Sequence, residues 1–345
     1  MTLHARLDDG ARDDCVDGEC PSDPRPMALT ALAALGAGAE RLGTFAAGFR
    51  TILELAHPPE PWPAGDAWAS RLGEPAARSA YRSLFGEWLD HEGPDRLLEQ
   101  TLPTLMEGVS AAAFHGPVRT AGAVAAGDAG ELVAGLADWA CRHEPIAVAA
   151  PRGPRLPRRA GPTHPAADDD RPASLDGVLG CLAATLAPMP RHGPIRDRLR
   201  TVVAQSAFGR EVARLGVDAE TLDALSRRAA RLFATTGDFT ALHMVIGCHA
   251  VQVLRPFFDA EGAAVGHLQR AWVAAWASCG AGLPAAAMPP TDAPPWETLV
   301  AAAIASDDPH TIQLVWSCRD LARRLGDADG VFRAAAARRG AEERR

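Results

Sequence analysis

The amino-acid sequence predicts an all-α protein: a single large multi-helix domain with a central ligand cavity between its helices. Three observations lead to this fold class. Alanine is abundant alongside leucine, arginine and glutamate, all of which favour helix. Apolar residues recur every three or four positions over long segments, whereas no run of β-branched residues shows the alternation typical of a strand. With 345 residues, the chain is long enough to bury a substantial core.

The helices are expected wherever apolar residues keep the helical period. The first spans 26–55, where Leu32, Leu35 and Phe45 lie on one face. The stretch HPPEPWP at 57–63 ends it, because proline restricts its own backbone and that of the preceding residue. Further helices are expected at about 75–90, 94–114, 128–143, 174–187, 194–214, 219–235, 239–258, 262–278, 296–305, 309–325 and 327–339.

Two of these helices begin with recognisable capping signals. Asp238 precedes the most apolar helix of the chain, and Asp308 followed by Pro309 precedes the helix at 309–325. An acidic residue at the N-cap accepts hydrogen bonds from the first free amides, and proline suits the first helical position. The start of each of these two helices is therefore predicted closely.

Two segments are expected to lie outside the packed helical domain, which is predicted to span 26–340. Residues 1–25 form an acidic tail expected to be disordered, and residues 151–172 form a mobile loop rich in proline and arginine. The seven cysteines include no CxxC pair and are interpreted as reduced thiols. The spacing of Cys15 and Cys20 in the tail also suits a metal ion or a disulfide, and both alternatives remain open.

Composition excludes several classes of function. The net charge is −8 and the basic residues are scattered among acidic ones, so nucleic acid is not expected as a partner. No apolar segment is long enough to cross a membrane and no secretory leader is visible, which predicts a cytoplasmic protein. The chain contains no lysine, so no Schiff base or lysine ligand is possible. Without a GxGxxG fingerprint, no bound flavin is expected.

Three histidines in apolar helical surroundings are the candidate metal ligands: His115, His243 and His310. Imidazole is the commonest transition-metal ligand, although a lone histidine in an apolar helix is more often a hydrogen-bonded core residue. His249 follows His243 by six residues, which places it about 120° further round the same helix, so the two should not reach one point. Gly116-Pro117 is expected to kink the helix directly after His115.

Five segments, in this order, resemble the questin oxidase-like family over residues 24–325 or thereabouts. The segments are PMALTALAALGAGAERL (26–42), AAFHGPVRTAG (112–122), LADWACRHEPI (136–146), TALHMVIGCHAVQVLRPF (240–257) and DDPHTIQLVWSC (307–318). The family looks all-helical, and its members include fungal enzymes that open anthraquinone-type rings by Baeyer–Villiger-like or dioxygenase-like oxidation. The resemblance implies a non-haem iron held by histidines and by a carboxylated lysine.

The resemblance places three of the ligands on His115, His243 and His310, and it departs at two positions. An N-terminal histidine of the family pattern falls at Pro24, and the lysine falls at Gln313. Gln313 is then a weak carbonyl ligand or a hydrogen-bond partner behind the ligands. His249 is a second candidate for that supporting role.

The expected function is therefore an oxygenase of specialised metabolism that acts on an aromatic, polyketide-like substrate with O2. Iron (Fe2+) at the three histidines would activate oxygen, with His243 as the catalytic residue and NADPH as an external reductant. Phe114, Trp272 and Trp276 are the candidate pocket-lining residues, with core packing as their alternative role. The alternative function is a metal-free family member, either a cofactor-independent oxygenase or cyclase with a histidine base, or a non-catalytic ligand-binding protein.

Overall fold

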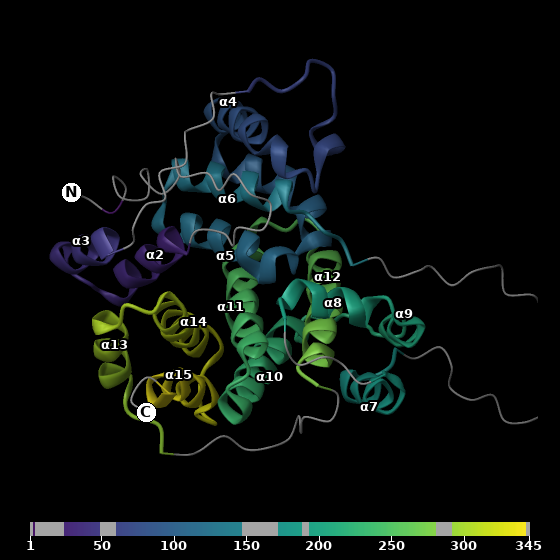
Figure 1. The fold of residues 1–345 in the computed structure, drawn as a ribbon, viewed down its shortest axis with the longest axis vertical. Coiled ribbons are helices and arrows are strands. Elements are labelled where there is room, and N and C mark those ends of the chain that lie inside the picture. The colour runs from purple at the N-terminus through teal and green to yellow at the C-terminus, as the bar shows by residue number, and fades with distance from the viewer. Residues whose placement is uncertain are drawn as a thin grey trace, which may run out of the picture.

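The computed structural model confirms the all-α fold class (Figure 1). It describes residue 3 and residues 24–48, 60–146, 172–187, 193–280 and 292–342. These ranges contain no strand, and an isolated bridge joins Ala173 to Leu215. The α-helices are α2 (Arg25–Leu35), α3 (Ala39–Gly48), α4 (Arg78–Leu105), α5 (Ala111–Ala126), α6 (Ala129–Cys141), α7 (Leu175–Thr185), α8 (Ile195–Val203), α9 (Ser206–Val212), α10 (Thr221–Thr236), α11 (Phe239–Leu254), α12 (Glu261–Ser278), α13 (Trp296–Ala305), α14 (Pro309–Leu325) and α15 (Val331–Glu342). Short 3₁₀ turns lie at Trp68–Arg71, Pro75–Ala77, Met106–Gly108 and Arg255–Phe257.

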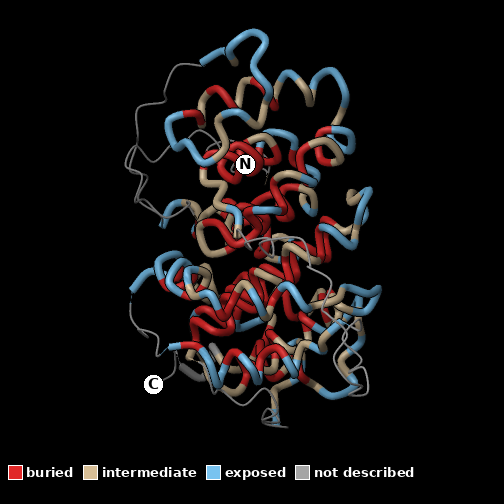
Figure 2. Tube along the Cα trace, turned by 90° about the vertical axis from the view of Figure 1, so that its right-hand side faces the viewer, coloured by how far each residue is buried: buried red, intermediate tan, exposed pale blue. Residues whose placement is uncertain are grey.

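Helix α11 is the central element of the fold. Every residue from Thr240 to Leu254 is buried, and α5, α10, α12 and α14 all pack against it. A helix that is apolar on all sides is stable only when other helices surround it, so the sequence of α11 requires this position. Figure 2 shows the buried segments running through the middle of the molecule, with exposed segments on the outside. Three helices that meet here, α5, α11 and α14, each carry one of the candidate histidines.

The predicted first helix at 26–55 is wrong in its length. The structure has two helices there, α2 and α3, separated at Gly36, and residues 49–59 lie outside the described part of the chain. Gly36 has a φ of 97°, and its amide donates to the carbonyl oxygens of Leu32 and Ala33. This left-handed cap ends α2, and glycine adopts it without the strain a Cβ would bring.

The expected kink at Gly116-Pro117 is also wrong in its position. Helix α5 continues through Pro117, and the irregular backbone lies before His115 instead. Ala112, Ala113 and Phe114 have φ values of 48°, 57° and 67°, so they form a left-handed turn. Regular right-handed helix resumes after this turn, and Pro117 therefore falls in a first turn, where its missing N–H has no helical partner to lose.

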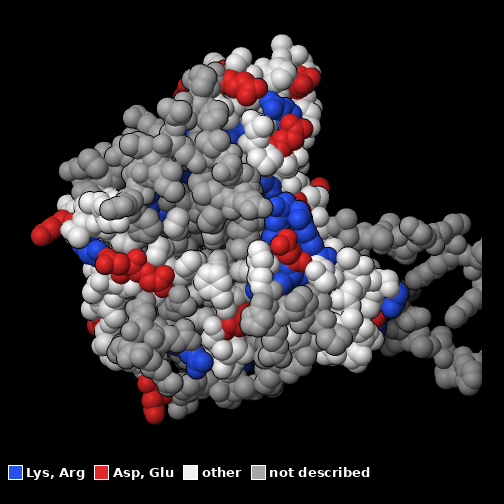
Figure 3. Space-filling view, in the orientation of Figure 1, with Lys and Arg blue, Asp and Glu red and all other residues white. Residues whose placement is uncertain are grey.

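Several sequence predictions concern residues outside the described ranges, among them the acidic tail with Cys15 and Cys20 and nearly all of the 151–172 loop. Within the described ranges, Cys141, Cys181, Cys248, Cys279 and Cys318 are all free thiols. No described helix is long and apolar enough to span a membrane. On the face shown in Figure 3, acidic and basic side chains are interspersed, with one group of basic residues around an acidic one.

Candidate metal centre

The structure brings His115, His243 and His310 together. Each histidine offers one ring nitrogen, and these three nitrogens all lie within 4.8 Å of one another. The His243 ring centroid is 5.4 Å from that of His115 and 5.3 Å from that of His310. Three side chains separated by up to 195 positions in the sequence therefore converge on one point, at a separation that a single metal ion could bridge.

His243 is held in the tautomer that a metal ligand needs. Its Nδ1 lies 2.9 Å from the carbonyl oxygen of Phe239, one turn earlier in α11. A carbonyl oxygen only accepts hydrogen bonds, so Nδ1 carries the hydrogen and donates it. The lone pair is then on Nε2, and the backbone of the helix fixes the ring orientation, as the partners behind metal-bound histidines commonly do.

His115 is prepared for the same role by its surroundings. Its Nδ1 is buried and makes no hydrogen bond to any residue in the described ranges. Burial, together with the charge of nearby His310, lowers the pKa of His115 to about 4. The imidazole is therefore neutral near pH 7, and its orphaned nitrogen is the kind of buried polar atom that a bound ion would satisfy.

This low pKa predicts how the stability of the metal-free protein depends on pH. In the unfolded chain His115 is protonated below about pH 6.5, whereas in the folded protein it is protonated only below about pH 4. Between these two values protonation therefore stabilises the unfolded state relative to the folded one. In chelator-treated protein, we expect the free energy of unfolding to fall by at most about 3 kcal/mol between these values because of His115. Denaturant titrations of wild type and His115→Gln should differ by an amount that shrinks as the pH falls through this window. A difference that is independent of pH would contradict the assignment.

His310 is positioned by the cap at the start of α14. As the sequence predicts, Asp308 is the N-cap, and its carboxylate accepts hydrogen bonds from the backbone amides of His310 at 3.3 Å and Thr311 at 3.1 Å. The His310 Nδ1 lies 3.6 Å from Asp308 Oδ1. The same carboxylate therefore fixes the first turn of the helix and limits where the imidazole can lie.

Arg41 on α3 holds the segment that leads into α14. Its Nε donates to the carbonyl oxygen of Ile304 at 2.5 Å, and its second nitrogen donates to the carbonyl oxygen of Ser306 and to Asp307 at 2.9 Å. This side chain is 19% exposed. One guanidinium thus ties the N-terminal part of the chain to the residues directly before His310.

Replacing Arg41 with methionine should loosen this segment while keeping the aliphatic stem. We expect a loss of about 1–3 kcal/mol in the free energy of unfolding, because partly buried carbonyl groups lose a charged donor. Metal affinity should fall as well, since the start of α14 carries His310. The control is Arg96→Met, which removes an exposed arginine paired with Glu99 within one helix. Equal stability of the two variants in denaturant titrations would show that the Arg41 contacts contribute nothing.

The left-handed turn before His115 is held in place by close packing on both sides. A Cβ at Gly247 of α11 would lie 2.8 Å from Cδ1 of Phe114, and one at Gly116 would lie 2.5 Å from Cγ of Trp139. Left-handed helical backbone costs about 1–2 kcal/mol for each residue other than glycine. Such strain persists only where the surroundings determine the conformation, and here it directly precedes a candidate ligand.

Buried ion pairs fix α5 against α6 and α6 against α4. Arg119 donates to both carboxylate oxygens of Glu131, at 2.5 Å and 3.0 Å, and both side chains are buried. The buried Asp138 pairs with Arg78 and Arg142. Burial alone would raise the pKa of Asp138, but these arginines hold it well below its usual range. The carboxylates near His115 are thus charged and already paired, which favours a structural role for them.

His249 lies away from the cluster, as its helical offset from His243 predicts. Its Nδ1 is 3.1 Å from Ser317 Oγ, and its Nε2 is 3.1 Å from Asp320 Oδ2. Burial lowers the pKa of His249, although Asp320 acts in the opposite direction. Since both ring nitrogens have other partners, the expected support from His249 for the ligand histidines is corrected to a link between α11 and α14.

The remaining predicted residues differ in where they lie. Gln313 is buried one turn after His310. Pro24 is the N-cap of α2 and has no ligand atom to offer. Trp272 and Trp276 are buried on α12, and their indole nitrogens have no hydrogen-bond partner among the described residues. The ring contacts observed for the three histidines do not include either tryptophan.

Phe239 is a residue of the site that the sequence reasoning missed. Its ring centroid lies 4.5 Å from that of His243 and 4.9 Å from that of His310. The signal was present in the sequence, because Phe239 directly follows the capping Asp238 and precedes His243 by four residues, on the same helical face.

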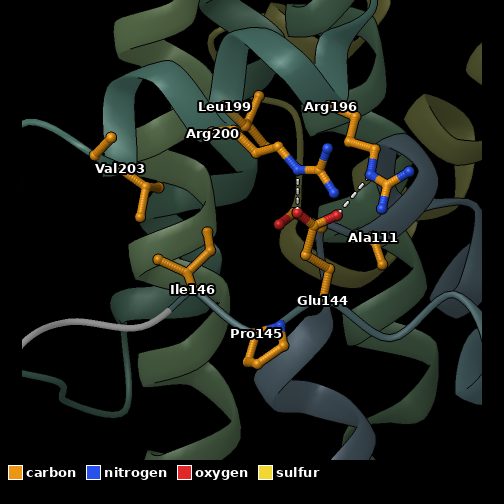
Figure 4. A pocket seen from close by; sticks show the side chains of 10 residues that line it. Ala111, Glu144, Pro145, Ile146, Arg196, Leu199, Arg200 and Val203 are labelled. Atoms are coloured by element: carbon orange, nitrogen blue, oxygen red, sulfur yellow. Dashed lines mark hydrogen bonds and ion pairs between the residues drawn. The ribbon is translucent and has the colours of Figure 1, made fainter. Parts of the chain in front are cut away.

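A separate pocket of about 220 Å³ lies between the start of α5, the end of α6 and α8 (Figure 4). Glu144 reaches across it to Arg196 and Arg200, and the apolar lining includes Ile146 and Leu199. None of the three histidines lines it, and its volume is below the roughly 300–1,000 Å³ typical of ligand sites. The pocket is therefore not the expected cavity at the cluster.

The family described as questin oxidase-like matches residues 25–318, which include all three histidines and most of the helical fold. No curated protein matches the chain. A family of this description indicates an oxidase-like enzyme, which agrees with a site able to hold a redox-active metal ion.

Proposed function

The chain belongs to the questin oxidase-like family, and from this premise we propose that it is an iron-dependent oxygenase. The observation that carries the proposal is the convergence of three histidine nitrogens within 4.8 Å. Its substrate is proposed to be an apolar aromatic compound of specialised metabolism. The described cysteines are unpaired thiols, which supports the reducing cytoplasm as the proposed compartment.

The donor set fits ferrous iron. Imidazole nitrogen binds iron well, and three protein ligands on one side of an ion leave positions for other molecules. Iron held by His115, His243 and His310 would supply the electrons that activate dioxygen. All three ligands are neutral, so the ligands themselves do not cancel the positive charge of the ion, and an acidic phenol would be attracted to the site.

Other features of the site have separate proposed roles in preparing the ligands and binding the substrate. The Phe239 carbonyl keeps the His243 lone pair directed away from its own helix backbone, and burial keeps His115 unprotonated. Gln313 stands where the family pattern has lysine, and its side-chain amide is proposed to hydrogen-bond an oxygen of the substrate. An amide both donates and accepts, so it can recognise a hydroxyl or a carbonyl group.

The need for a reductant separates the two kinds of oxygenation. Inserting one oxygen atom, as in a Baeyer–Villiger-like reaction, requires two electrons from an external donor such as NADPH, and the second oxygen leaves as water. A ring-cleaving dioxygenation places both oxygen atoms in the product and needs no such donor. Oxygen consumption with and without NADPH therefore decides between them.

Metal analysis tests the proposal most directly. Full-length protein reconstituted anaerobically with Fe2+ and then desalted should retain about one equivalent of iron. It should also consume O2 in the presence of 1,8-dihydroxyanthraquinone, used as a probe substrate. Retention below about a tenth of an equivalent would overturn the iron-dependent function.

One observation favours a metal-free alternative. His243 donates from Nδ1 to the Phe239 carbonyl, which puts its lone pair on Nε2, and this is also the arrangement of a general base for an acidic phenol. In that case, chelator-treated protein would keep its full turnover of the probe. A protein that binds the probe but never turns it over would be a ligand-binding member of the family.

A further inference from the structure

Phe239 has an exposure unusual for this protein. Among the described residues, two large hydrophobic side chains are exposed, Phe239 at 44% and Val217 at 38%. The other residues of α11, from Thr240 to Leu254, are all buried. A single exposed apolar side chain is ordinary on a protein surface. Its contacts, however, set Phe239 apart from Val217.

The Phe239 ring contacts two candidate ligands from two different helices. It meets His243 of α11 at an interplanar angle of 74° and His310 of α14 at 65°, both edge-to-face. His243 itself is 2% exposed, whereas His115 and His310 both retain partial exposure. The cluster is therefore closed at His243 and reaches solvent at His310, where the exposed Phe239 ring lies beside it.

The backbone that carries the Phe239 ring is fixed by hydrogen bonds. Asp238 accepts hydrogen bonds from the amides of Thr240 and Ala241, which fixes the first turn of α11. The Phe239 carbonyl accepts the His243 Nδ1 hydrogen, which ties this residue to the imidazole. An aromatic side chain on a fixed backbone has only two χ angles left to order, so it presents apolar surface at little cost in conformational entropy.

We propose that the exposed surface of Phe239 is the platform on which a flat, apolar ring of the substrate lies beside the three histidines. This inference rests on the proposed function, because it assigns a substrate contact at the same site. The platform makes Phe239 a specificity-determining residue: it favours planar aromatic molecules over aliphatic ones of equal hydrophobicity. If Phe239 only shielded the three histidines from solvent, no preference for planar aromatic molecules would be expected.

The test measures binding separately from turnover. Full-length wild type and Phe239→Ala, each loaded with Co2+ in place of iron, are titrated with 1,8-dihydroxyanthraquinone and followed by its visible absorbance. We expect the alanine variant to bind Co2+ with unchanged stoichiometry and the probe about tenfold more weakly. The Phe239→Leu variant should also bind the probe weakly, whereas Phe239→Trp should restore probe affinity. Of these two replacements, tryptophan keeps an aromatic face, and unlike tyrosine it adds no metal-binding hydroxyl. Val217→Ala is the matched control and should match wild type.

The possible results distinguish a failure of the proposed platform from a failure of the proposed function. Wild type that binds Co2+ and the probe, with equal probe affinity in Phe239→Ala, would overturn the platform and leave the proposed function standing. Full affinity in Phe239→Leu would show that hydrophobic area suffices, which also overturns it. Wild type that binds neither Co2+ nor the probe would overturn both.

Discussion

Replacing His243 with alanine should reduce the affinity for Fe2+ by at least about a hundredfold. Loss of a partner behind a metal-bound histidine already costs about 10–100-fold, and His243 is itself a proposed ligand. It is also the central member of the cluster, since its ring contacts those of both His115 and His310. Equilibrium dialysis with Fe2+ under anaerobic conditions measures this affinity, and O2 consumption should be lost in parallel.

His249→Ala is a closely matched control, because it removes a histidine of the same helix with the same 2% exposure. It breaks the hydrogen bonds to Ser317 and Asp320, so it should lower stability and leave iron stoichiometry intact. Circular dichroism and thermal unfolding show whether each variant is folded. Iron binding that falls equally in both variants would mean that α11, and not its His243 imidazole, supports the metal.

Replacing Gly247 with alanine should destabilise the protein by about 1–3 kcal/mol, the usual range for an overpacked core. The added Cβ would lie 2.8 Å from the ring of Phe114, which is buried and has left-handed backbone. Phe114 cannot withdraw without moving the strained turn, and His115 is the next residue. Iron affinity should therefore decrease together with stability.

Gly180→Ala is the control for this substitution, because a Cβ there meets no atom within 4 Å. Alanine is more favourable than glycine inside a helix, so this variant should be stabilised by about 0.5–1 kcal/mol. The two substitutions are chemically identical and should shift the midpoint of urea unfolding in opposite directions. A stabilised Gly247→Ala protein would show that Phe114 has room to move and that its turn is not held by this contact.

The left-handed turn at 112–114 explains why one part of the site was not predictable. Alanine and phenylalanine have no local preference for positive φ, so nothing in the segment VSAAAFHGP (109–117) indicates such a turn. The turn depends on Gly247, more than 130 positions away, which alone leaves room for the Phe114 ring. Arg41 presents the same difficulty, since its partners before His310 are more than 260 positions distant.

Local chemistry by itself determined the helical class, the capping of α11 and α14 by Asp238 and Asp308, and the divergence of His249 from His243. Each follows from the period of the helix or from hydrogen bonds within one turn, both of which are properties of adjacent residues. Family resemblance selected the three histidines. Only the tertiary structure decided that their nitrogens meet, that His115 is neutral and that Phe239 lies open beside them, because contact between α5, α11 and α14 depends on packing across the whole chain.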